Sequence, residues 1–247
     1  MPSWIEQSVA RGILTSRYPR EEATEVEVPV TGRPPLPVIA PISIAAVASC
    51  PVGAISATAV DQGKCIRCAR CLPKGFAFTG AVESATRSRA ELLGDPPDRN
   101  RGARTAAPLA ELGRSLHVFM VDVGSCNACN LEVLALANPF YDSQRLGVFF
   151  TNSPRHADVL LVVGVPTAEM VEPLRRAYDA LPAPKAVVAV GTCPISGGVF
   201  AGAPGLAGPL EGLLPVDVFV PGCPPTPVGI LDGLLKLAGR DRRSREV

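Results

Sequence analysis

The sequence predicts an α/β protein in which a doubly wound parallel-sheet domain follows a small α+β domain. In the second half of the chain, apolar runs alternate with stretches of helical character. One of these runs, at 159–163, is apolar throughout, which is typical of a strand in a parallel sheet covered on both faces. The first half instead combines many prolines and glycines with three cysteines at two-residue intervals, which indicates a small, loop-rich unit.

The expected elements of the second half follow one another in a regular order. Five runs rich in β-branched and aliphatic residues are predicted as strands, at 116–123, 146–151, 158–165, 186–190 and 216–220. Three stretches are predicted as helices, at 131–137, 169–181 and 228–237. Because strands that alternate with helices form βαβ units, we expect one flavodoxin-like parallel sheet with helices on both faces.

A turn-rich, charged and aperiodic stretch that begins at Gly94 separates the two halves. We therefore predict a first domain at 1–93, a linker at 94–114 and the α/β domain at 115–247. A chain of 247 residues is long enough for two domains. Near the start, Ile5, Val9 and Ile13 share one helical face, which favours a short helix packed on its own domain or docked on a partner or a membrane surface.

The cysteines of the first domain have the spacing of an iron–sulfur site. Cys65, Cys68 and Cys71 form the three-ligand run of a bacterial ferredoxin, and the fourth ligand of such a run is a remote Cys-Pro pair. Cys50-Pro51 is that pair, so these four cysteines are predicted to hold one [4Fe–4S] cluster in a ferredoxin-like domain. The positions that would bind a second cluster hold other residues, namely Ala40, Ser43, Ala46 and Gly75.

The remaining cysteines all follow predicted strands. Cys126 and Cys129 come after the first strand, Cys193 after the fourth and Cys223 after the fifth. Because ligands of doubly wound domains lie outside the carboxyl ends of the strands, these four thiols are expected to meet there. We predict that they hold a second [4Fe–4S] cluster.

Three glycines beside these cysteines are predicted to line the same site. Gly124, Gly191 and Gly222 allow backbone N–H groups to turn toward cluster sulfurs, although ordinary turn chemistry explains glycines as well. Zinc is the main alternative to a cluster, because Cys-x2-Cys pairs are frequent zinc ligands. A disulfide framework is not expected, since no signal peptide precedes the cysteines and disulfides are rare in a reducing cytosol.

Composition excludes two other classes of protein. The net charge of +1 leaves no electrostatic footprint for nucleic acid, so no nucleic-acid partner is expected. Residues 34–60 carry no charged side chain and are numerous enough to span a membrane. Prolines interrupt that segment and Cys50 belongs to the cysteine motif, so a transmembrane helix is not expected there.

Several motifs resemble those of a known family. The α/β domain resembles the small subunit of membrane-associated [NiFe] hydrogenases of the formate hydrogenlyase type. The superfamily of that subunit also includes the cluster-bearing B subunit of complex I. The similar motifs are Cys126-Asn-Ala-Cys129, Ser153-Pro-Arg-His-Ala-Asp, Gly191-Thr-Cys193, Ser196-Gly-Gly and Val216-Asp-Val-Phe-Val-Pro-Gly-Cys223. The first domain resembles the separate ferredoxin-like subunit of those complexes at Gly12-Ile-Leu-Thr-Ser-Arg-Tyr-Pro, Cys50-Pro51 and Phe78-Thr-Gly-Ala-Val-Glu-Ser-Ala-Thr-Arg.

The resemblance implies a function. The chain is expected to be an electron-transfer subunit, a fusion of two subunits, that relays electrons through two [4Fe–4S] clusters to or from a catalytic large subunit. Other iron–sulfur subunits and a membrane arm are the further expected partners, and the expected location is the cytoplasmic face of the cell membrane. No catalytic residue is expected in this chain, because no constellation of nucleophile and base is evident.

Details of the motifs separate the alternatives. The complex I subunit has its first two ligands as adjacent cysteines, whereas two residues lie between Cys126 and Cys129. Asn130 stands where many hydrogenase small subunits have an acid. Glu132 matches a second acid of that family. Its carboxylate either faces the active site of the large subunit or is an exposed group that favours the dipole of its own helix. The alternatives are a quinone- or other acceptor-reducing relative without nickel, and, from a different class, a stand-alone iron–sulfur sensor or a flavin carrier.

Overall fold

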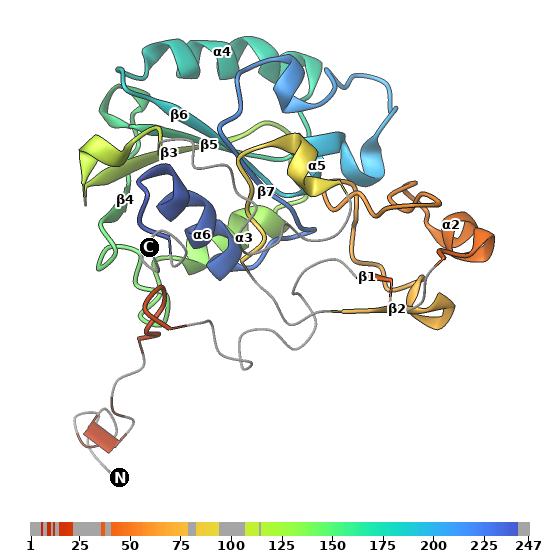
Figure 1. Ribbon diagram of the computed structural model, residues 1–247. Coiled ribbons are helices and arrows are strands. Elements are labelled where there is room, and N and C mark those ends of the chain that lie inside the picture. Colours follow the sequence, from red (N-terminus) through yellow and green to blue (C-terminus); the bar gives the residue numbers. More distant parts are fainter. Residues whose placement is uncertain are drawn as a thin grey trace.

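A five-stranded parallel sheet dominates the described part of the chain (Figure 1). A computed structural model describes residues 6, 9–10, 12, 15–21, 36–37, 41–78, 83–93, 107–113 and 115–241. The strands are β3 (Leu116–Asp122), β4 (Val148–Phe150), β5 (Val159–Val163), β6 (Ala186–Val190) and β7 (Val218–Val220). Their order, β4-β3-β5-β6-β7, is the flavodoxin-like order, so the predicted doubly wound α/β fold is confirmed.

The side chains of the central strands alternate between two cores, one on each face of the sheet. Every residue of β5 and β6 is buried, as expected for strands covered on both faces. Val159 and Leu161 belong to one core, whereas Leu160 and Val162 belong to the other. Successive strand residues point to opposite faces, so a continuous apolar run supplies both cores at once.

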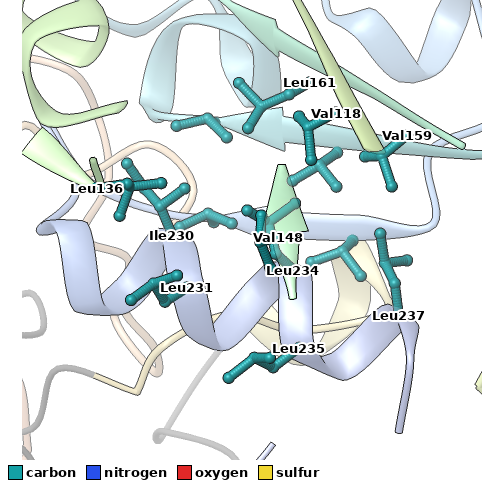
Figure 2. Close-up of a cluster of buried hydrophobic side chains, with 14 of the residues drawn as sticks. Val118, Leu136, Val148, Val159, Leu161, Ile230, Leu231, Leu234, Leu235 and Leu237 are labelled. Atoms are coloured by element: carbon teal, nitrogen blue, oxygen red, sulfur yellow. The ribbon is translucent and has the colours of Figure 1, made fainter. Parts of the chain in front are cut away.

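Helices complete the two outer layers. On one face lie α3 (Ala128–Ala135) and α6 (Pro227–Leu237), and Figure 2 shows Ile230 of α6 beside Leu136 and Leu234 of α6 beside Val148 of the sheet. On the other face lie α4 (Val171–Ala180), which contributes Leu174, and the short helix α5 (Thr192–Ser196). Every residue of α6 is buried, and its sequence is accordingly apolar almost all round.

Most predicted elements exist, with shifted ends. The strand at Ala186–Val190 has the predicted bounds, while β4, β5 and β7 are shorter than predicted. The helix predicted at 131–137 is α3, which begins at Ala128, and the helix predicted at 169–181 is a turn of 3₁₀ helix followed by α4. The sequence does not predict α5, because a five-residue helix is too short to show a period.

The first domain is described only in part. There, β1 (Leu36–Pro37) pairs antiparallel with β2 (Phe76–Ala77), and α2 (Ile44–Ser49) packs its buried Ala46 with Phe76 in a small core. Ser43 caps α2 by accepting a hydrogen bond from Ala46 N at 3.2 Å. Ser43 and Ala46 occupy two of the positions that would bind a second ferredoxin cluster, and here they serve as a helix cap and a core residue.

The described segments outside 115–241 also contact the α/β layers. Tyr18, Ala85 and Leu109 are buried in the core that contains α6, and Leu92 is buried in the opposite core. The short helix expected near Ile5 lies largely outside the described residues, as does most of the predicted linker. Among the helices that the structure describes, each is too short or too polar to cross a lipid bilayer.

Candidate metal centres

The four cysteines of the α/β domain gather at the carboxyl edge of the sheet. Cys126 lies in the loop after β3, and Cys129 lies in the first turn of α3. Cys193 lies at the start of α5, directly after β6, while Cys223 follows β7. In the strand order, β3 is the point from which successive connections run in opposite directions, and such switch points are where doubly wound folds bind their ligands.

These thiols are close enough to influence one another electrostatically. Burial, followed by the charges of Cys193, Cys223 and Cys126, raises the pKa of Cys129 to about 12. Burial, followed by Cys223 and Cys126, raises the pKa of Cys193 to about 11. In the described residues no three His, Cys, Asp or Glu side chains meet around a point that would hold a single metal ion. Four thiolates this close together would repel one another, and a cationic iron–sulfur core offsets that repulsion.

The glycines beside the cysteines have different neighbours. Gly191 has φ +93°, and a Cβ there would lie 2.7 Å from Cys129 Sγ, so its backbone lies directly against the sulfur of Cys129. Gly124 and Gly222 also have positive φ, but a Cβ on them would meet Val165 O at 2.6 Å and Pro225 Cα at 2.5 Å. Of the three predicted glycines, therefore, only Gly191 faces a cysteine sulfur among its nearest neighbours.

A carboxylate that the sequence patterns did not single out holds the Cys126 loop. Asp122, at the end of β3, accepts hydrogen bonds from Gly124 N (2.9 Å), Ser125 N (2.8 Å), Ser125 Oγ (2.6 Å) and Asn130 Nδ2 (2.7 Å). Burial raises the pKa of Asp122, but these hydrogen bonds outweigh it and leave the pKa below its ordinary value. The sequence does contain a signal for this role, namely an aspartate two residues before a glycine at the end of a strand. Asp side chains often accept a hydrogen bond from the backbone N–H two residues later in the chain.

The cysteines of the first domain line a pocket of their own. Cys50, Cys65, Cys68 and Cys71 surround about 360 Å³ of space, part of it open to solvent, together with the apolar Ile55 and Val60. Burial raises the pKa of Cys65 to about 11, although the backbone N–H and the charge of Arg67 oppose the shift; Cys71 and Cys50 add smaller contributions in the upward direction. The structure therefore brings together all four cysteines that were predicted as one ligand set.

The backbone of this pocket supplies hydrogen bonds to sulfur. Ala54 N donates to Cys50 Sγ at 3.2 Å, and Arg67 N donates to Cys65 Sγ at 3.4 Å. Arg67 and Ala69 both have left-handed backbone, with φ +55° and +63°, which is costly for residues other than glycine. Such strain is retained at ligand sites, and backbone N–H groups that donate to sulfur suit bound thiolates. Both cysteine sets therefore fit an iron–sulfur group.

The two cysteine sites are in direct contact. The hydroxyl of Thr192, next to Cys193, shares its single proton between two carbonyls, that of Cys65 at 3.2 Å and that of Gly222 at 3.0 Å. Ser196 donates to the carbonyl of Gly63 at 2.9 Å. Sequence reasoning missed these contacts, because they join segments that are far apart in the chain.

The other residues of the sequence motifs lie near the sites or on the surface. Glu132 is half-buried on α3, where burial raises its pKa and Arg67 opposes that shift. Arg155 and His156 lie on a turn of 3₁₀ helix before β5, where both side chains are exposed.

The sequence of this chain is similar to a known family and to several known proteins. Residues 126–237 match the family model of the NADH ubiquinone oxidoreductase 20 kDa subunit. A probable membrane-bound hydrogenase subunit, mbhJ of Pyrococcus furiosus, is 47% identical over 139 residues, which are 56% of this chain and 83% of that protein. Formate hydrogenlyase subunit 7 of Escherichia coli is 39% identical over 142 residues, 58% of this chain and 56% of that protein. A subunit of the F(420)H(2) dehydrogenase of Methanosarcina mazei is 40% identical over 119 residues, 48% and 64% of the two chains.

Proposed function

Because this chain belongs to the family of the 20 kDa subunit of NADH ubiquinone oxidoreductase, we propose that it is the electron-transfer subunit of a membrane-associated [NiFe] hydrogenase complex. The observation that carries the proposal is the gathering of Cys126, Cys129, Cys193 and Cys223 at the carboxyl edge of the sheet. Ligand sites of doubly wound folds lie at that edge, and these thiols come from three separate connections.

Two sets of residues would hold the cofactors. The four cysteines of the α/β domain would hold a proximal [4Fe–4S] cluster, and Cys50, Cys65, Cys68 and Cys71 a second one. When bound, each cluster supplies a site that takes up and releases one electron. The surrounding N–H donors and Gly191 shape the pockets, and the contacts of Thr192 and Ser196 keep the two pockets adjacent. All eight cysteines are used as ligands, so this chain offers no free thiol for catalysis.

A partner surface surrounds the proximal site. Cys126 is exposed, and on α3 nearby Leu131 and Leu134 are 59% and 64% exposed. After α5, Val199 and Phe200 are also exposed, at 59% and 43%. Large apolar side chains in water are typical of a surface that a partner covers. We assign this surface to the catalytic large subunit, with Glu132 close by.

Further partners and the location follow from the same proposal. Other iron–sulfur subunits would exchange electrons through the first domain, at 1–93, and a membrane arm would hold the complex at the inner face of the cell membrane. The division into 1–93, a linker at 94–114 and 115–247 belongs to the proposal. Relatives named as membrane-bound hydrogenase and formate hydrogenlyase subunits support such an assembly.

One alternative has support of its own. A relative named as a subunit of F(420)H(2) dehydrogenase is 40% identical over 119 residues, which favours an acceptor-reducing complex without nickel. The two residues between Cys126 and Cys129 are the sequence feature that favours the hydrogenase.

Metal analysis of the native complex tests the proposal. Purified without oxygen, the complex should contain nickel, reduce a dye with hydrogen, and carry about eight irons on this chain. A pure complex that retains its large subunit and shows neither nickel nor hydrogen activity would favour the acceptor-reducing alternative. About four irons and one tightly bound zinc would reject one of the two clusters. Turnover by this chain alone, or a flavin in place of iron, would reject both oxidoreductase assignments.

Two cysteine variants test the division of the ligands. Cys68→Ala should remove the signal of the first cluster in electron paramagnetic resonance, and Cys193→Ala that of the proximal cluster. Each variant should retain the other signal in a folded protein. If one substitution abolished both signals while the protein stayed folded, the two sets of four would be wrong.

A further inference from the structure

Arg67 connects the two cysteine sites. Its backbone belongs to the run Cys65–Cys71, and its side chain reaches the α/β domain. The guanidinium donates from Nη1 to the carbonyl of Pro224 at 3.3 Å and from Nη2 to the carbonyl of Pro221 at 3.2 Å. These carbonyls flank Cys223. A side chain from one predicted ligand loop is thus anchored on both sides of a ligand from the other.

The charge of Arg67 acts on both sets of ligands. Arg67 N donates to Cys65 Sγ at 3.4 Å, and its guanidinium binds the carbonyls on either side of Cys223. Cys65 belongs to the first set and Cys223 to the proximal set. The guanidinium stays protonated at neutral pH, and its partial burial reduces the screening that weakens charges in open water.

Neighbouring charge influences an iron–sulfur cluster in a known direction. Reduction adds a negative charge, so a nearby cation stabilises the reduced form and raises the reduction potential. Arg70 lies in the same cysteine run but is less enclosed, and among the described contacts it makes no hydrogen bond or ion pair across to the α/β domain. It carries the same charge in a position where solvent screens it, which makes it a matched control.

We propose that Arg67 is a positioning residue between the two clusters, which fixes the first ligand loop against the Cys223 loop and raises the reduction potentials of both clusters together. The inference rests on the proposed function, because it requires both cysteine sets to bind clusters. It adds a residue that is not a ligand, and it explains why an arginine in left-handed backbone is enclosed between the sites. A cation shared by the two clusters would shift both potentials in the same direction, so the difference between them would change less than either value.

The test compares three variants of the full chain in its native complex. Arg67→Gln removes the charge and shortens the side chain, Arg67→Lys keeps the charge without the planar pair of donors, and Arg70→Gln removes the same charge from the more open position. Midpoint potentials of both clusters are measured by redox titration followed by electron paramagnetic resonance. With R67Q, both potentials should fall by about 59 mV, a tenfold change in each reduction equilibrium. R67K should remain closer to the unmodified chain, and R70Q should move neither potential appreciably.

The outcomes separate the inference from the proposed function. An unmodified chain without iron would reject the proposed function and the inference with it. Both clusters present, with R67Q shifting one potential only or shifting them no more than R70Q, would overturn the role of Arg67 alone. If R67Q loses its clusters, Arg67→Met makes the same comparison with an apolar stem. Loss from R67Q and R67M with retention in R67K supports the electrostatic role, whereas loss from all three overturns it.

Discussion

Thr86 and Phe219 exchange two backbone hydrogen bonds. Thr86 N donates to Phe219 O at 2.9 Å, and Phe219 N donates to Thr86 O at 2.8 Å. Phe219 lies in the middle of β7, at the edge of the parallel sheet, and both residues are 2% exposed. The segment at 83–93 therefore covers part of an edge strand that would otherwise present unpaired groups. It also holds the region after the first cysteine set against the α/β domain.

Replacing Thr86 by proline should destabilise this junction. The variant loses the N–H donor and leaves the Phe219 carbonyl buried without that partner, which costs about 1–3 kcal/mol in the free energy of unfolding. Urea unfolding of the anaerobically purified holoprotein measures the difference. Thr86→Val is the matched control, because it keeps the backbone pair and loses only the hydroxyl bond to Ser88 O. Equal midpoints for the two variants would mean that the pairing adds nothing to stability.

The sequence is sufficient to predict the α/β sheet because its signals are local. A continuous apolar run such as Val159–Val163 predicts a buried strand wherever it occurs, and the alternation with helices predicts the winding. The cysteine sets can be proposed from spacing, and from the rule that ligands lie beyond the carboxyl ends of strands. The spacing does not show that the two cysteine sets lie next to each other, and the structure does.

The remaining features depend on contacts between distant segments. Thr192 and Cys65 are joined by one hydrogen bond, and neither residue's neighbours in sequence indicate the other. The local sequence likewise gives no sign that Thr86 pairs with Phe219 of β7, or that the side chain of Arg67 reaches the loop of Cys223. The hydrogen bonds of Asp122 are local, and here the sequence did hold a signal, a turn-forming acid at the end of a strand.

A buried ion pair in α6 gives a second prediction. Asp232 is 1% exposed and pairs with Lys236 one turn later, while Tyr18 Oη donates to Asp232 Oδ1 at 3.4 Å. Asp232→Ala removes the carboxylate beside a buried ammonium, so it should lower the free energy of unfolding by about 3–5 kcal/mol. The double variant Asp232→Leu with Lys236→Met removes both charges and should cost clearly less. Urea midpoints compare the two, and an equal or larger loss in the double variant would contradict the electrostatic explanation.

The Asp122–Asn130 hydrogen bond predicts a pH-dependent effect. Asn130→Asp replaces the amide donor, now 2.7 Å from Asp122 Oδ2, by a second carboxylate. At pH 7 the two charges repel, and because the site is largely exposed the expected loss is about 1 kcal/mol. Below about pH 5 the loss should shrink, because one carboxyl of a close pair takes up a proton more readily than an isolated one.

In the unmodified protein, the stability that Asp122 contributes should decrease, not recover, as the pH falls. The lowered pKa of Asp122 contributes stability that is present above its ordinary pKa, near about 4, and is lost as the pH falls through the lower folded value. Asn130→Ala is the control, since it removes the donor without adding a charge and should show a loss that is nearly constant between about pH 5 and about pH 8. Thermal midpoints between about pH 3 and about pH 8 decide, and parallel curves for N130D and N130A over that whole range would refute charge repulsion as the cause.

Gly191 offers a test that addresses one cluster at a time. With φ +93°, an alanine at this position is strained, and its Cβ would lie 2.7 Å from Cys129 Sγ and 3.5 Å from Gly222 O. Gly191→Ala should therefore displace a proximal ligand and lower the iron content from about eight atoms to about four, with the signal of the first cluster retained. Gly212→Ala is the control, because a Cβ there meets nothing within 4 Å. Iron analysis and electron paramagnetic resonance read out both variants. If G191A kept both signals, Cys129 would not be a ligand that depends on this close approach; if it lost both in a folded chain, the two sites would not bind their clusters independently.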